Sequence, residues 1–266
     1  MGVSVNYYKT IDNFEIMKTY KEIFTEWHSE FPFLKQYSPS TLFQKVGPML
    51  IGLRIEQPWE EIYRVILEAI PLWKTERKDF GNTILYDPLL NKKGGQVLTT
   101  FRHHDLDFKE ALEDAKKLYG LVLTPSIPLN DLIEYLDIQS TRLHDNCGSK
   151  GSRSKGCRTI ELELAIATYL NKEELYNDIW EDAIKATKVW DAKRFKICMG
   201  ISIEEWLESL HSMFENRDKF IETVEWNYQR PRVAKLNTGH ITKVDEYTRY
   251  VPKLSWREKL RSLFIK

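Results

Sequence analysis

The spacing of apolar residues changes along this chain, and this change limits the fold more than any other feature. The first half alternates apolar runs of strand length, such as residues 49–55, with segments of helical spacing. Beyond residue 158, apolar residues recur mainly at intervals typical of amphipathic helices. The pattern predicts an α/β or α+β fold, with a mixed sheet of short strands and a helix-rich C-terminal half.

Three segments show the spacing of helices. Residues 11–27 and 107–119 are predicted to be helical from the positions of their apolar side chains. A third helix is predicted at residues 202–215, where Ser202 and Glu205 fit a capping box. In such a box the serine and the third helical residue bond each other's free backbone groups, which predicts where the helix begins.

Shorter apolar segments predict strands. Residues 83–87 and 96–102 flank a loop that contains Lys-Lys-Gly-Gly, so we expect a hairpin. Residues 195–199 are predicted as another strand. Residues 58–73 fit both helical and strand spacing: their apolar residues form one stripe of a helix or one face of a strand. Their similarity to the starts of predicted helices elsewhere in the chain slightly favours the helix.

The length of 266 residues is within reach of one large domain or of two tightly packed ones. Its 42% hydrophobic and 12% aromatic content is sufficient for a core, and no low-complexity tract separates the two halves. We therefore expect one compact unit. In it a mixed α/β part (1–138) is joined by a basic Gly/Ser/Lys loop (139–158) to a helix-rich part (159–266) that packs on the first.

Charges are segregated along the chain, although the formal net charge is zero. Residues 139–158 hold five Lys and Arg against one acidic residue, and residues 228–266 hold ten against three. The remaining chain is correspondingly acidic. This distribution predicts local binding of an acidic partner, whereas zero net charge gives no general attraction to nucleic acid or membrane.

Cysteine content and the N-terminal residues indicate the compartment. Cys147, Cys157 and Cys198 are too few for a disulfide framework and fit a reducing environment. Residues 1–14 lack the basic start and apolar core of a secretory signal, and no apolar run approaches the length of a membrane span. We expect a cytoplasmic protein without membrane insertion.

The most chemically suggestive segment is HDNCGSKGSRSKGCRT, residues 144–159. His144, Cys147 and Cys157 are its candidate metal ligands, but the close cysteine pair of structural zinc sites is absent. A nucleotide phosphate loop is disfavoured because its last glycine is followed by Cys-Arg rather than by Lys and a hydroxyl residue. Two interpretations stay open: a solvated loop, and a basic loop that orders against an acidic partner. We expect no metal and no cofactor.

A second cluster, FRHHDLDF, contains His103, His104 and Asp105. A histidine with a carboxylate can perform acid–base chemistry, so these three residues are the catalytic candidates. If a strand continues to Asp105, the side chains of His103 and Asp105 point to one face of the sheet and that of His104 points to the other. The favoured interpretation is a strand end followed by an aspartate cap for the next helix.

The sequence contains no Gly-x-Ser-x-Gly, His-Glu-x-x-His or dinucleotide glycine motif. We therefore predict an interaction protein without intrinsic catalysis, with another protein as its partner, and an immunity, inhibitor or defence-accessory role fits this prediction. Nucleic-acid binding, and a hydrolase or nuclease at the histidine cluster, stay open as alternatives. The predicted partner-binding residues are Lys150, Arg153, Lys155, Arg158, Lys253, Trp256, Arg257, Lys259 and Arg261.

Overall fold

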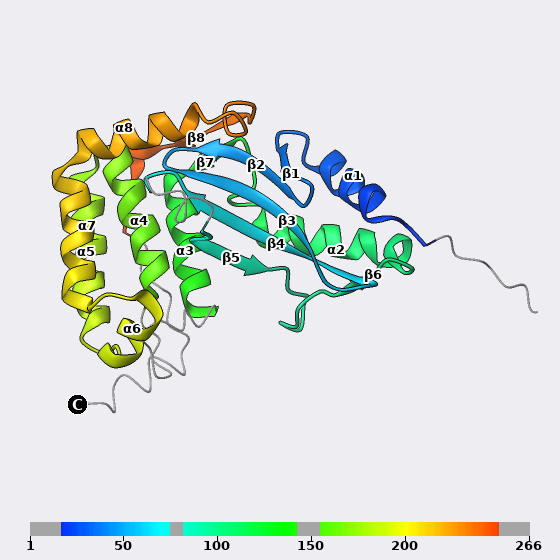
Figure 1. Cartoon of the computed structure of the whole chain (residues 1–266), viewed down its shortest axis with the longest axis horizontal. Coiled ribbons are helices and arrows are strands. Elements are labelled where there is room, and N and C mark those ends of the chain that lie inside the picture. The colour runs from blue at the N-terminus through cyan, green and yellow to red at the C-terminus, as the bar shows by residue number, and fades with distance from the viewer. Residues whose placement is uncertain (1–16, 75–81, 143–154, 250–266) are drawn as a thin grey trace, which may run out of the picture.

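A curled sheet runs through the middle of the molecule, with helices packed around it (Figure 1). The computed structural model describes residues 17–74, 82–142 and 155–249. Within them the predicted mixed sheet and helix-rich C-terminal half are confirmed, and the class is α+β. The strands are β1 (Lys35–Ser38), β2 (Thr41–Val46), β3 (Met49–Trp59), β4 (Ile62–Pro71), β5 (Leu85–Pro88), β6 (Thr99–Thr100), β7 (Ser126–Pro128) and β8 (Thr238–Thr242).

The order of strands in the sheet is β5-β4-β3-β2-β8-β7, with β1 beside β2 and β6 beside β4. The pairs that β8 makes with β2 and β7 are parallel, and the other described pairs are antiparallel. β1 and β8 both pair with β2, β1 at residues 41–43 and β8 at residues 45–46. β8, a late strand of the chain, therefore lies beside the first hairpin.

Most helices follow the sheet in the chain and gather at one end of it (Figure 1). The central helix contacts four of the others, and its residues 159–168 are buried on every side. Six of these ten residues are apolar, and the buried polar ones include Glu161 and Glu163. The helices are α1 (Tyr20–Glu30), α2 (His104–Tyr119), α3 (Leu129–Arg142), the central α4 (Cys157–Leu170), α5 (Glu173–Thr187), α6 (Ala192–Met199), α7 (Ile203–Glu215), α8 (Arg217–Tyr228) and the 3-10 helix η1 (Val244–Glu246).

The hydrophobic core is continuous between the sheet and the helices. Trp27 of α1, Leu67 of β4 and Leu164 of α4 all belong to it and are fully buried. None of the helices in the described part of the chain is long and apolar enough to cross a bilayer.

Helices with local start signals follow the sequence prediction closely. The capping box of Ser202 and Glu205 is present, so α7 begins at the expected residue. The predicted helix at 107–119 is confirmed within α2. α1 begins only at Tyr20, because Thr19 and Glu22 form a second capping box, and residues 11–16 lie outside the described residues.

Residues 58–73 form a strand over most of their length, and the slight preference for a helix was wrong. They make up much of the β3–β4 hairpin, which stays in register from Met49 opposite Pro71 to Glu56 opposite Arg64. β4 is buried on both faces over residues 65–71, so its apolar residues do not alternate as they do in a half-exposed strand.

One further strand prediction and one predicted pairing of strands were wrong. Residues 195–199 belong to α6, which the Asp191 side chain caps at its start and the left-handed Gly200 ends. Residues 83–87 and 96–102 do not pair as a hairpin of two strands. Instead β5 and β6 both pair with β4, and only Leu90 and Gln96 bridge the two segments.

Candidate functional site

Lys155 and Arg158 are the predicted partner-binding residues that the structure describes, and they lie in different surroundings. The Lys155 side chain is 13% exposed, and its Nζ atom lies 2.5 Å from Asp137 and 2.7 Å from Glu163. Its charge is thus balanced inside the protein, so Lys155 is not placed to bind a partner at the surface. The others, Lys150, Arg153, Lys253, Trp256, Arg257, Lys259 and Arg261, lie outside the described residues.

Burial and charge act against each other at this ion pair. Burial raises the pKa of Glu163 to about 7, although the positive charge of Lys155 limits the rise. Burial also acts to lower the pKa of Lys155, but the carboxylates of Glu163 and Asp137 outweigh it and raise that pKa above its ordinary value. The pair therefore anchors the chain where it enters α4.

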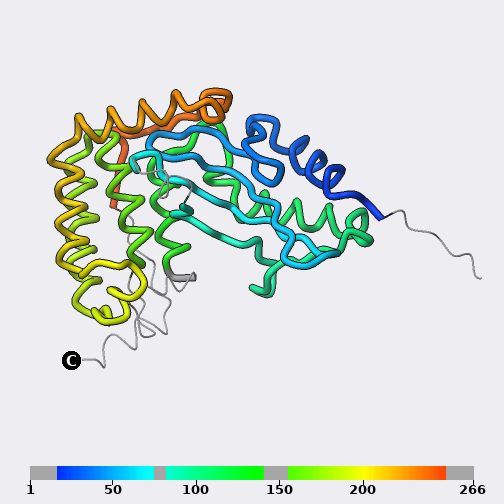
Figure 2. The backbone as a smooth tube through the Cα atoms, viewed as in Figure 1, coloured from blue at the N-terminus to red at the C-terminus, as the bar shows by residue number. Residues whose placement is uncertain are grey.

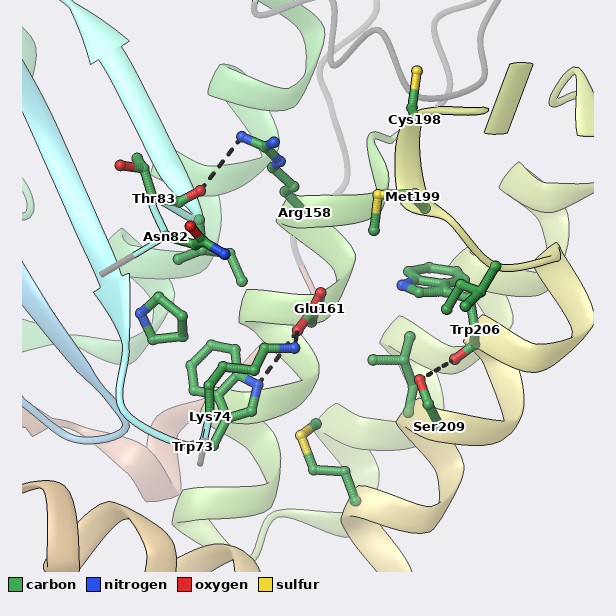
Figure 3. A pocket seen from close by; sticks show the side chains of 15 residues that line it. Trp73, Lys74, Asn82, Thr83, Arg158, Glu161, Cys198, Met199, Trp206 and Ser209 are labelled. Carbon is green, nitrogen blue, oxygen red and sulfur yellow. Dashed lines mark hydrogen bonds and ion pairs between the residues drawn. The ribbon is translucent and has the colours of Figure 1, made fainter. Parts of the chain in front are cut away.

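Arg158 stands at the rim of a cleft of about 790 Å³ between the end of β4 and helices α4, α6 and α7 (Figure 3). Its side chain is exposed in the first turn of α4, and one guanidinium N–H donates to the backbone carbonyl of Thr83 at 3.4 Å. The lining is Pro71, Trp73, Lys74, Asn82, Thr83, Ile84, Arg158, Glu161, Cys198, Met199, Ile201, Trp206, Ser209, Leu210 and Met213.

An ion pair lies inside the cleft. Glu161 is buried and forms an ion pair with Lys74, and it accepts a hydrogen bond of 3.4 Å from the indole N–H of Trp73. Lys74 and Glu161 therefore neutralise each other. Arg158 adds a positive charge at the rim, where an acidic group of a bound molecule can reach it.

The opposite wall of the cleft, on α6 and α7, is apolar and rich in sulfur. Trp206 is 2% exposed, and Figure 3 shows its ring facing the cleft from α7, with Met199 beside it at the end of α6. Among the described residues, the Trp206 indole N–H has no hydrogen-bond partner. Methionine adapts its shape to different neighbours, so this wall suits an apolar side chain of variable form.

The described lining of the cleft holds no histidine. Cys198 is exposed but has no histidine beside it in this lining, and the Ser209 hydroxyl donates to the backbone carbonyl of Trp206. A nucleophile activated by a neighbouring base is therefore not found among these residues.

No protein-family model, no curated protein and no solved structure matches this chain.

The three catalytic candidates lie at the start of α2 rather than on a strand. His103 is the exposed N-cap residue, and neither its side chain nor that of Asp105 caps the helix, so the predicted aspartate cap was wrong. His104 is fully buried: its Nδ1 lies 2.7 Å from the Tyr63 hydroxyl and its Nε2 lies 2.7 Å from Glu26. His104 thus links the sheet to α1.

Glu26, His104 and Asp105 are the described residues that could together hold a metal ion, since their ligand atoms lie within 4.8 Å of one another. The ammonium of Lys18, however, pairs with Glu26 and lies 2.5 Å from Asp105. The hydrogen bonds that Lys18 donates to Asp105 and Glu26 raise the pKa of Lys18. Lysine therefore supplies the positive charge in this cluster, which is a complete hydrogen-bonded network.

Of the sequence-predicted metal ligands, Cys157 lies within the described residues. Cys157 is buried, and its Sγ contacts the Met199 Sδ at 3.8 Å. His144 and Cys147 lie outside the described residues.

Residues of the cleft other than Arg158 were not predicted. One signal was available. Glu161 and Glu163 interrupt the otherwise apolar segment IELELAIA, residues 160–167 of α4, and a buried carboxylate in such a helix needs a partner. The tryptophans gave no signal, because apolar spacing alone does not separate a core residue from one that lines a cleft.

Proposed function

We propose that this protein has no catalytic activity of its own and acts in the cytoplasm by binding another protein, whose acidic segment occupies the cleft beside Arg158. The observation that carries the proposal is the position of Arg158, a predicted partner-binding residue, at the rim of a large cleft with an apolar wall. An immunity, inhibitor or defence-accessory role is consistent with such binding.

The size and chemistry of the cleft support an occupant with one acidic and one apolar group. Its volume of about 790 Å³ falls within the usual range of ligand sites. Tryptophan and arginine contribute strongly to binding when water is excluded around them, and Trp206 and Arg158 lie on opposite sides of this cleft. A carboxylate at Arg158 places a neighbouring apolar side chain against the α7 wall.

The direct test compares Arg158→Glu with the wild type and with Lys109→Glu as baits for affinity purification from the native cells. Lys109 is exposed on α2 and carries the same charge, so it controls for the change in net charge. Quantitative mass spectrometry of the eluates, with recovery of bound nucleic acid, identifies what each bait retains. We expect a protein that wild type and Lys109→Glu retain equally and that Arg158→Glu loses.

The affinity of that protein, measured by biolayer interferometry, should fall about tenfold or more for Arg158→Glu. Equal affinity of both variants would reject the cleft as the binding site. Nucleic acid retained in place of a protein, and lost with Arg158→Glu, would support the alternative of nucleic-acid binding.

Cys198 offers a local probe of the same cleft. It is exposed in the lining whereas Cys157 is buried, so a Cys147→Ser variant should react with a thiol reagent at Cys198. The identified partner should slow this reaction if it occupies the cleft. An unchanged rate at saturating partner would place the contact elsewhere.

A further inference from the structure

A second surface lies at the C-terminal end of α8, where the chain turns back toward the sheet beside the β1–β2 hairpin (Figure 2). The side-chain amide of Asn237 donates to the Phe33 carbonyl at 2.8 Å, and the backbone N–H of Lys45 donates to the Asn237 carbonyl at 2.9 Å. These bonds fix the turn against the sheet. We name the Trp226 surface by its residues Lys45, Trp226, Tyr228, Arg230, Arg232 and Lys235.

Aromatic rings and cations are paired on this surface. Trp226 is 57% exposed, and the Arg230 guanidinium lies over its ring, 4.6 Å from the centroid. The Lys45 ammonium lies over the Tyr228 ring at 5.2 Å. Such contacts hold the long cationic side chains in place before any partner arrives, which lowers the entropy lost on binding.

Among the described residues, Lys45, Arg232 and Lys235 form no ion pair with a carboxylate, and the segment from 226 to 237 contains no acidic residue. Arg232 and Lys235 are exposed in a helical turn closed by hydrogen bonds between residues 230 and 234 and between 233 and 236. The positive charge is therefore held on a structured part of the chain.

The positive charge of this turn also acts on Tyr37 of β1. Burial raises the pKa of Tyr37, and the positive charges of Arg232 and Arg230 act in the opposite direction. The turn after α8 therefore lies close to the start of β1, as the hydrogen bond from Asn237 to the Phe33 carbonyl also shows.

The surroundings limit what can bind. Glu222 and Glu225 are exposed on α8 just before Trp226, so the basic patch ends at an acidic edge. A long nucleic-acid backbone that followed α8 would meet these carboxylates, whereas a compact acidic face would fit within the patch. An exposed tryptophan beside arginine is also the composition of protein-binding hot spots.

We infer that the Trp226 surface is a second docking site, separate from the Arg158 cleft, for a protein face that presents several carboxylates around an apolar side chain. The carboxylates pair with Lys45, Arg232 and Lys235, and the apolar side chain covers the exposed Trp226 ring. Burial of that ring supplies the affinity, and the ion pairs set the orientation and the rate of association.

The test uses the full chain and a fluorescent peptide of about ten glutamates with a central phenylalanine, measured by fluorescence anisotropy at low salt. The main variant, Arg232→Glu/Lys235→Glu, changes two exposed residues. Its matched control, Lys109→Glu/Lys117→Glu, makes the same charge change at two exposed positions of α2.

We expect the main variant to bind the peptide about tenfold or more weakly, and Lys109→Glu/Lys117→Glu to stay within about twofold of the wild type. A second peptide carries alanine in place of the central phenylalanine. The affinity of Trp226→Ala for the phenylalanine peptide should be no higher than the affinity of the wild type for this alanine peptide. Folding of each variant is checked by circular dichroism.

Three outcomes would overturn the inference. One is the absence of peptide binding to the wild type at low salt. The second is an equal loss of peptide affinity in the main variant and in Lys109→Glu/Lys117→Glu, which would indicate non-specific charge attraction. The third is tighter binding of single-stranded DNA with the same number of charges, also lost in the main variant, which would make the surface a nucleic-acid site.

Discussion

The ammonium nitrogen of Lys155 lies 2.7 Å from Oε2 of Glu163, in the interior between α3 and α4. Asp137 of α3 holds the same nitrogen at 2.5 Å. The second carboxyl oxygen of Glu163 is buried without a hydrogen-bond partner among the described residues. One lysine of the basic segment therefore stabilises the packing of two helices.

Replacing Lys155 with methionine should lower the free energy of unfolding by about 3 to 5 kcal/mol, because the variant leaves two buried carboxyl groups without their cation. Urea unfolding followed by circular dichroism at neutral pH measures the change. Lys109→Met, at an exposed position without an ion pair in the described structure, is the control and should stay within about 0.5 kcal/mol of the wild type. A similar small effect for Lys155→Met would show that the ion pair is not stabilising.

The stability contribution of Glu163 should depend on pH. Its pKa is about 7 in the folded protein against an ordinary value of 4.5, because burial disfavours the charged form. Between these pH values the folded state binds a proton that the unfolded chain has released, so the free energy of unfolding falls as pH rises from 4.5 to 7. The loss, relative to a Glu163→Gln variant that cannot titrate, should be on the order of 3 kcal/mol. Urea unfolding of both proteins across this range checks it, and a constant difference would contradict the raised pKa.

The two neighbouring histidines should respond differently to truncation. His104→Ala leaves the Tyr63 hydroxyl and the Glu26 carboxylate without their shared partner and opens a cavity, so we expect a loss of about 3 kcal/mol. His103→Ala removes only an exposed side chain and should cost less than about 0.5 kcal/mol. Thermal and urea unfolding of both variants distinguish the two positions, and equal effects would contradict the structural role of His104.

Gly52 should not tolerate a side chain. A Cβ atom at this position would lie 1.9 Å from the backbone carbonyl oxygen of Leu42, where β2 and β3 approach each other. Gly52→Ala should therefore cost about 3 kcal/mol or more, since neither backbone can move without breaking the hairpin. Gly95→Ala is the matched control, because its nearest neighbour is the Asn91 side chain at 3.4 Å. Urea unfolding should show Gly95→Ala close to the wild type, and a tolerated Gly52→Ala would mean that the strands are farther apart.

Elements with short-range hydrogen bonds were predictable from the chain alone. Ser202 and Glu205 are three residues apart, so their capping box places the start of α7 without any contact from elsewhere. The fold class was predictable for a similar reason. Apolar residues at strand spacing show that one face of a segment is buried, and apolar residues at helical spacing show that one stripe is buried. Residues 58–73 departed from this rule because burial on both faces of β4 removed the alternation.

The sequence by itself determined the composition of the elements, the uneven distribution of charge and the presence of Arg158 in a basic segment. Only the tertiary structure decided which charges are neutralised and which surfaces are formed. His104 meets partners 41 and 78 residues away in the sequence, and Arg158 reaches a carbonyl 75 residues away. Such contacts depend on how strands and helices pack, and local spacing carries no information about them. For that reason Lys155 is an internal anchor, whereas Arg158 stands at a cleft, although the two residues are neighbours in the sequence.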